Sequence, residues 1–173
     1  MTVEPTVEPN RDNWETPWPV IYAVSDWMGA PPSVDLCASH TNKKANAYFT
    51  QSQDLLSRDP RAQASWRDNW AWMNPPYSRA LILQFCSWAA RCAAAGNTIA
   101  ILVNIDKSTE WYRTLAPHIR AELVPPTRIQ FVAPAGVRPS KNSKMQSILV
   151  VGPRRPWDPP AGVYPSFPLE VQQ

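Results

Sequence analysis

The residues with the clearest chemical signature form one tetrapeptide after an apolar run at 70–73: Asn74, Pro75, Pro76 and Tyr77. Composition alone predicts about 0.003 occurrences of it in this chain, so chance is a poor explanation. Two consecutive prolines fix an extended turn and leave the preceding carbonyl groups without partners. Asn74 adds a second acceptor, and Tyr77 adds a flat ring on which a planar base can stack. We therefore predict a catalytic loop that holds an amino group between two acceptors and turns its lone pair toward an electrophile.

Charge is distributed unevenly along the 173 residues. Residues 1–112 contain 9 basic and 11 acidic side chains, whereas residues 113–173 contain 8 basic and 3 acidic ones. This basic C-terminal third favours contact with a polyanion. The nucleic-acid-binding residues that we predict are Arg79, Lys107, Arg138, Lys141 and Lys144. The alternative is a solvated basic face without a ligand.

Composition excludes several other kinds of site. With 5 glycines, the chain has no glycine-rich phosphate-binding loop. The three cysteines lack CxxC spacing and the two histidines lack HxxxH spacing, so we expect neither a disulfide framework nor a metal site. No apolar run reaches 18 residues and the first ten residues are acidic, so we predict no membrane span and no signal peptide. A cytoplasmic protein is expected.

Hydrophobic periodicity predicts an α/β fold around the tetrapeptide. A helix is expected at 17–28, and a second helical period runs from 78 to a glycine at 96. Apolar runs predict buried strands at 33–38, 70–73 and 98–103. This strand, helix, strand order is typical of a parallel sheet with both faces covered. The first strand delivers Asp35 and Ser39 to its carboxyl end, and the run at 70–73 leads into the tetrapeptide.

Three further strands are predicted downstream, at 120–124, 129–132 and 147–151. No helix separates the last two, which predicts an antiparallel edge joined by the loop 133–146. Residues 1–11 are expected to be a disordered arm, 12–152 one domain, and 153–173 a proline-rich tail lying on the surface.

From Asp12 to Gly152 the sequence resembles the phage-type DNA N-6-adenine methyltransferases, the Dam-like family. The resemblance rests on motifs in the family's order: DNWETP at 12–17, DLCAS at 35–39, YFT at 48–50, Asp54, and NPPYSR at 74–79. It implies one Rossmann-like methyltransferase domain with a mostly parallel, trimmed sheet. It also implies S-adenosylmethionine as cofactor, S-adenosylhomocysteine as product, double-stranded DNA as partner, and the adenine N-6 amino group as acceptor.

The motifs also suggest how the cofactor is held. Thr16 and Pro17 at a helix start could bind its carboxylate, and Asp35 could bind its ammonium group. Asp54 follows at the spacing of an acid that binds ribose hydroxyls, although it could equally meet the adenine amino group. The predicted cofactor-binding residues are Trp14, Thr16, Pro17, Asp35, Cys37, Ala38, Ser39, Asp54 and Asn74. An ordinary helix cap at Thr16 and a solvated acid at Asp54 are the structural alternatives.

Two other functions remain open at this level. The same loop could methylate a different amino acceptor: cytosine N-4, RNA or protein glutamine. The chain could also be a non-catalytic phage DNA-binding module, because residues 35–40 contain no glycine where most methyltransferases have a glycine-rich loop.

Overall fold

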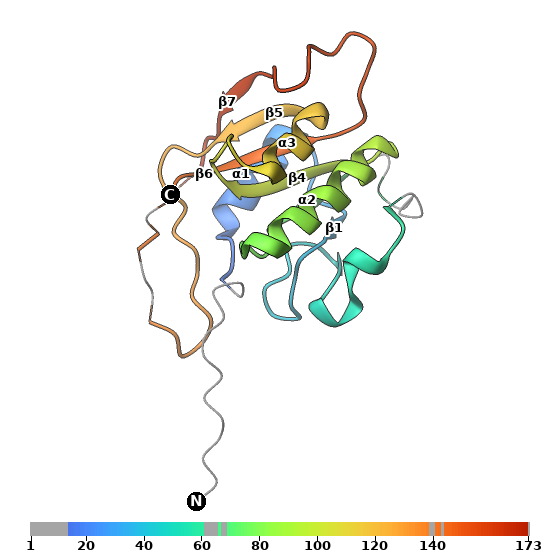
Figure 1. Cartoon of the computed structure of the whole chain (residues 1–173). Coiled ribbons are helices and arrows are strands. Elements are labelled where there is room, and N and C mark those ends of the chain that lie inside the picture. The colour runs from blue at the N-terminus through green and yellow to red at the C-terminus, as the bar shows by residue number, and fades with distance from the viewer. Residues whose placement is uncertain (1–13, 61–65, 67–68, 139–140, 143, 173) are drawn as a thin grey trace, which may run out of the picture.

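A single mixed sheet organises the protein (Figure 1). The computed structural model describes residues 14–60, 66, 69–138, 141–142 and 144–172, so the expected arm at 1–11 lies outside the described residues. The strands are β1 (Val34–Asp35), β2 (Ala47–Tyr48), β3 (Trp70–Met73), β4 (Thr98–Asn104), β5 (Ile119–Val124), β6 (Gln146–Val151) and β7 (Ser166–Pro168). Their order across the sheet is β2-β1-β3-β4-β6-β5-β7. Only β6 runs against its neighbours, β4 and β5, which confirms a mostly parallel sheet with an antiparallel part.

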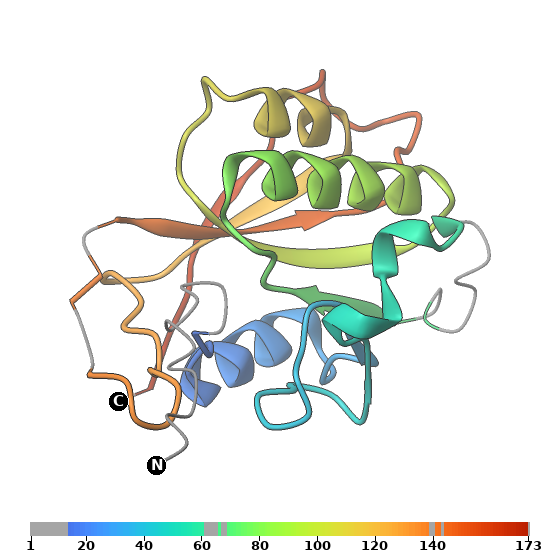
Figure 2. The same ribbon diagram turned by 60° about the horizontal axis from the view of Figure 1, so that its bottom comes forward.

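Helices cover both faces of the sheet (Figure 2). The α-helices are α1 (Trp18–Met28), α2 (Arg79–Ala94) and α3 (Glu110–Leu115), and the 3-10 turns are η2 (Gln51–Gln53), η3 (Leu55–Ser57) and η6 (Ala116–His118). One hydrophobic cluster joins α2 and α3 to one face, and a second joins α1 to the other. The expected α/β architecture is therefore confirmed.

Local sequence explains where α1 begins and ends. Pro17 occupies the N-cap, and Gly29 ends the helix in the left-handed conformation with φ 81°. Glycine adopts this conformation without the steric cost that a Cβ atom would bring. Val20, Ile21 and Val24 recur at helical spacing and are buried against the sheet.

The parallel strands deliver their carboxyl ends to one edge of the sheet. In the register of β1 with β3, Asp35 lies opposite Trp72, and in that of β3 with β4, Met73 lies opposite Ile101. The residues that follow β3 therefore emerge next to Asp35. This is the edge at which open α/β sheets bind ligands.

The predicted strand at 129–132 is wrong. Both edges of β6 are already occupied, by β4 and β5, so no edge is free for a hairpin partner. Ile129 is instead buried in the core, and Val132 makes one isolated antiparallel bridge with Glu15. The predicted strand at 33–38 shortens to β1, because Asp35 turns the chain by accepting the Cys37 N–H.

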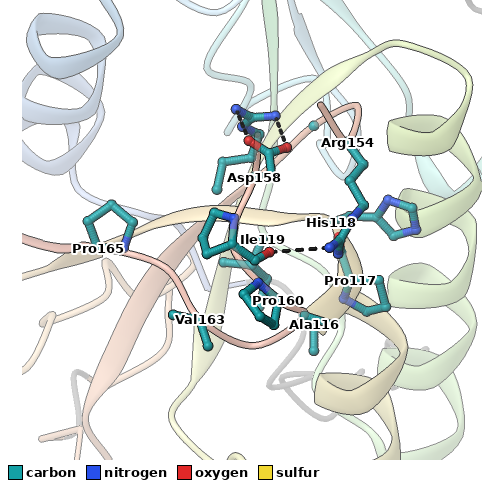
Figure 3. A pocket seen from close by; sticks show the side chains of 13 residues that line it. Ala116, Pro117, His118, Ile119, Arg154, Asp158, Pro160, Val163 and Pro165 are labelled. Atoms are coloured by element: carbon teal, nitrogen blue, oxygen red, sulfur yellow. Dashed lines mark hydrogen bonds and ion pairs between the residues drawn. The ribbon is translucent and has the colours of Figure 1, made fainter. Parts of the chain in front are cut away.

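The chain beyond 152 contributes a strand that the sequence does not predict. β7 pairs with the free edge of β5, where Pro165 before the strand and Pro168 at its end cost few hydrogen bonds. Leu169, the next residue, is 3% exposed and belongs to the core. At the amino ends of the parallel strands, away from Asn74, Asp158 accepts two hydrogen bonds from Arg120, at 2.9 and 3.0 Å. Figure 3 shows the small pocket of about 40 Å³ that Asp158 and Arg154 line there.

Candidate functional site

The loop between β3 and α2 is held together by the Tyr77 hydroxyl. It donates to Asn74 Oδ1 at 2.9 Å and lies 3.1 Å from the carbonyl oxygen of Leu102 in β4. Burial raises the pKa of Tyr77 above its ordinary value, so the hydroxyl keeps its proton and remains a donor. The Asn74 side chain is thus fixed relative to the sheet.

Two acceptors of the loop remain open. An amide oxygen has two lone pairs, so Asn74 Oδ1 can accept a second hydrogen bond besides that from Tyr77. Pro75 is buried, and no described residue donates a hydrogen bond to its carbonyl oxygen. The geometry is compatible with the predicted pair of acceptors, and it gives the Tyr77 hydroxyl a role that stacking alone does not include.

A small polar pocket, here called the Asp35 pocket, adjoins Asn74 and encloses about 20 Å³. Its lining residues are Trp14, Glu15, Thr16, Asp35, Cys37, Asn42, Lys44, Trp72 and Asn74. Five of these are predicted cofactor-binding residues that come from three separate motifs of the sequence. The fold therefore brings together the parts of the chain that the sequence assigns to one cofactor.

Asp35 is 2% exposed, and both oxygens of its carboxylate accept backbone hydrogen bonds. Oδ2 accepts from Lys44 N at 2.9 Å and Oδ1 from Cys37 N at 3.2 Å. Desolvation raises the pKa of Asp35 to about 6, against the lowering effect of these bonds and of the Lys44 charge. A cation that entered the pocket would favour the ionised carboxylate.

Thr16 does not cap α1. It lies two residues before the helix, which has no side-chain cap, so the structural alternative of an ordinary helix cap is wrong. Thr16 is 2% exposed, and no described group bonds to its buried Oγ1. Burying a hydroxyl without a partner is costly, so this orphaned atom in the wall of the Asp35 pocket is a feature that a ligand would satisfy.

Four predicted cofactor-binding residues do not line this pocket. Pro17 is the N-cap of α1, Ala38 N donates to Phe49 O at 2.9 Å, and Ser39 N donates to Asn42 Oδ1 at 2.6 Å. Asp54 is exposed in the left-handed conformation, with φ 43°. Their roles stay predictions.

A larger cleft, here called the Tyr77 cleft, is lined by the other end of the loop and has a volume of about 840 Å³. Its polar and charged lining includes Tyr77, Arg79, Asp106, Arg113 and Lys144. A cavity of this size accommodates a drug-sized ligand or a single nucleotide. Tyr77 lines this cleft, and its hydroxyl holds Asn74, which lines the Asp35 pocket.

Four of the predicted nucleic-acid-binding residues lie at the Tyr77 cleft or on the loop that leads to it, and the fifth makes other contacts. Arg79 and Lys144 line the Tyr77 cleft, and Arg138 and Lys141 are exposed on the loop that leads to Lys144. Lys107 instead lies 3.5 Å from Glu122, with its amine over the ring of Tyr164. All five assignments stay predictions.

Sequence reasoning missed Glu15 and Lys44, which pair inside the Asp35 pocket. Lys44 follows another lysine in a polar stretch, a pattern typical of solvated charges. Its burial arises from the fold, because its backbone N–H must reach Asp35. Two backbone hydrogen bonds also join Glu15 to Val132, which connects this pocket to the start of the basic loop.

The described parts of the chain contain neither a membrane-spanning helix nor a cluster of metal ligands. Within them, no helix has the length and apolar character needed to cross a membrane. Across the same residues, no three histidine, cysteine or acidic side chains gather in a way that could hold a metal ion.

Comparison with known proteins gives two matches. The sequence family described as DNA N-6-adenine-methyltransferase (Dam) matches residues 4–167. A curated relative, the DNA N-6-adenine-methyltransferase of Haemophilus phage HP1 (strain HP1c1), is 28% identical over 161 residues. That alignment covers 91% of this chain and 88% of the relative.

Proposed function

This chain belongs to the DNA N-6-adenine-methyltransferase (Dam) family, and on that premise we propose that it transfers a methyl group from S-adenosylmethionine to the N-6 amino group of adenine in double-stranded DNA. The observation that carries the proposal is the position of the Asn74 loop. Asn74 lines the Asp35 pocket and Tyr77 lines the Tyr77 cleft, and a 2.9 Å hydrogen bond joins the two side chains. A methyl donor on one side and a flipped base on the other would meet at Asn74.

The residues of the Asp35 pocket fit the amino-acid end of S-adenosylmethionine. That end carries an ammonium group and a carboxylate, and the pocket offers the buried Asp35 carboxylate and the orphaned Thr16 hydroxyl. When bound, the cofactor supplies an electrophilic methyl group. Asp35 would bind the ammonium group, and Thr16 would donate to the carboxylate.

Asn74 and Pro75 would bind the acceptor. Their open oxygens suit the two hydrogens of an exocyclic amino group, and accepting both turns the nitrogen lone pair away from the loop. Proximity and orientation then supply most of the rate, because bringing two reactants together in the right geometry is worth about 7–11 kcal/mol. No strong base is required from the chain.

The Tyr77 cleft and the basic loop would bind DNA. The cleft has room for one flipped nucleotide, whose base the Tyr77 ring would stack against. Arg79 and Lys144 at the cleft would contact the flanking phosphates, with Arg138 and Lys141 farther along the duplex.

Nucleoside mass spectrometry tests the proposal directly. The purified protein is incubated with isotopically labelled S-adenosylmethionine and unmethylated duplex DNA, with parallel samples of RNA and protein, and the DNA is digested to nucleosides. Labelled N6-methyldeoxyadenosine is expected from the wild type, and about 100- to 1,000-fold less of it per unit time from Asn74→Ala. Labelled N4-methyldeoxycytidine, label in RNA or protein alone, or DNA binding without label would each refute the proposal.

A further inference from the structure

Lys44 is a buried cation that the proposed chemistry does not yet use. Its side chain is 2% exposed, and its ammonium group pairs with Glu15 and lies 4.6 Å from the ring centre of Trp18. Among the described residues that line the Asp35 pocket, Lys44 is the one that carries a positive charge.

A purely structural ion pair is a weak explanation for this burial. Removing a lysine from water costs several kcal/mol, and a buried pair often contributes no more stability than apolar residues of the same volume. Glu15 is more exposed than Lys44, with 27% of its side chain open to solvent, so the pair is sealed on the lysine side and open on the other. Both residues line the Asp35 pocket, and the pair meets solvent through Glu15.

The charges around the pocket specify the missing partner. Glu15 and Asp35 outnumber Lys44, so a ligand with net positive charge is favoured, and Asp35 suits an ammonium group. A carboxylate entering the same buried space needs a cation and further donors, because an unpaired buried charge is strongly unfavourable. Lys44 supplies the cation and the orphaned Thr16 hydroxyl supplies a further donor, and the flexible lysine side chain can follow an entering carboxylate.

We propose that Lys44 binds the carboxylate of the cofactor's amino-acid end together with Thr16, and that Glu15 holds the lysine amine in the pocket until the ligand arrives. The proposal rests on the proposed function, because it assumes that S-adenosylmethionine is the ligand of this pocket. It gives the pocket a separate group for each charge: Asp35 for the ammonium group and Lys44 for the carboxylate. Lys44 thereby becomes a residue that selects the intact amino acid.

Calorimetric titration with three ligands tests this without any measurement of turnover. S-adenosylhomocysteine carries both charges, its decarboxylated analogue carries only the amine, and 5′-methylthioadenosine carries neither. Each is titrated into the wild type, Lys44→Met and Lys43→Met, without DNA. Lys43 is the matched control, because it is the neighbouring lysine, is exposed, and lies over the ring of Tyr48 outside the pocket.

In the wild type, S-adenosylhomocysteine should bind about 10- to 100-fold more tightly than its decarboxylated analogue, the range expected for a charged hydrogen bond. Lys44→Met should remove this preference and leave the affinity for 5′-methylthioadenosine within about twofold. Lys43→Met should behave as the wild type. Because Lys44→Met leaves Glu15 unpaired, the double variant Lys44→Met/Glu15→Gln is titrated as well, and it should show the same loss of preference.

The results separate this inference from the function on which it rests. If the wild type binds S-adenosylhomocysteine but Lys44→Met keeps the preference for the carboxylate, the role of Lys44 is refuted and the proposed function stands. If Lys44→Met weakens all three ligands equally, the lysine supports the pocket rather than recognising the carboxylate, and the inference fails. If the wild type binds none of the ligands, both proposals fail. A wild type that binds the decarboxylated analogue equally well refutes the inference even if the variants do not fold.

Discussion

Asp35 should make the free protein lose stability as the pH rises from about 4 to about 6. Burial raises the pKa of Asp35 from 3.8 to about 6 in the folded protein. In the unfolded chain the carboxylate is solvated and ionises near its ordinary pKa. The folded protein therefore binds the proton more tightly, and stability falls as pH rises from about 4 to about 6 and is constant above about 7. The difference between the two pKa values lowers the free energy of unfolding by about 3 kcal/mol at neutral pH.

Asp35→Asn removes this cost together with one of the two backbone hydrogen bonds to the carboxylate. The amide NH₂ cannot accept a bond from Lys44 N or Cys37 N, and one unpaired N–H costs about 1–3 kcal/mol. The variant should therefore be less stable than the wild type at pH 4 and about as stable or more stable at pH 8. The stability difference between the two proteins should change by about 3 kcal/mol across that range.

Urea unfolding of both proteins at pH 4, 6 and 8 measures this change. Calorimetry with S-adenosylhomocysteine adds a second signature, since the ligand's ammonium group requires the ionised carboxylate. Wild-type affinity should fall about tenfold for each pH unit below about 6, with proton release on binding in that range, and Asp35→Asn should bind weakly at every pH. A stability difference that does not vary with pH would refute the buried-carboxylate reasoning.

Four other outcomes follow from the described contacts. Asn74→Ala should lower turnover by about 100- to 1,000-fold while S-adenosylhomocysteine binding survives. Tyr77→Phe should lower kcat, with the KM for DNA little changed, because the tyrosine hydroxyl holds Asn74. Equal activity of Tyr77→Phe and the wild type would show that only the ring of Tyr77 matters. Replacing Arg138, Lys141 and Lys144 together with alanine should reduce the slope of log affinity for DNA against log salt by about 3 in filter-binding titrations, and an unchanged slope would place the phosphate contacts elsewhere. Leu169→Ala should lower the free energy of unfolding in urea by about 2–5 kcal/mol, because the side chain is buried in the core next to β7. A loss below about 0.5 kcal/mol would mean that the β7 segment contributes little to the stability of the fold.

The sequence predicts the elements whose pattern is local. α1, β3, α2 and β4 are found within a residue or two, because each carries its own apolar period and its own end signals. The strands that were missed or misplaced depend on which sheet edges remain free. Residues 129–132 have the composition of a strand but no edge to pair with, and β7 lacks the composition but meets the open edge of β5.

The candidate site divides in the same way. The Asn74 loop and Asp35 can be found from the sequence, since a motif and the end of an apolar strand identify them. Lys44 and Glu15 cannot, because their types are common on surfaces and no motif links two positions that lie 29 apart in the sequence. Their pairing arises only when the turn after β1 brings Lys44 N to the Asp35 carboxylate.

The reversed direction of β6 explains which part of the basic C-terminal third can serve the site. An antiparallel strand begins at the edge where its parallel neighbours end, and Gln146 at the start of β6 bonds to Asn104 at the end of β4. The loop with Arg138 and Lys144 is therefore delivered to the same edge as Asn74. The segment after β6 returns to the opposite ends of the strands, where Arg154 bonds to the backbone carbonyl groups of Pro117 and Pro159. Net charge alone would count both basic segments toward DNA, but the strand order brings the first of them to the end of the sheet that carries Asn74, so we expect the DNA contacts there.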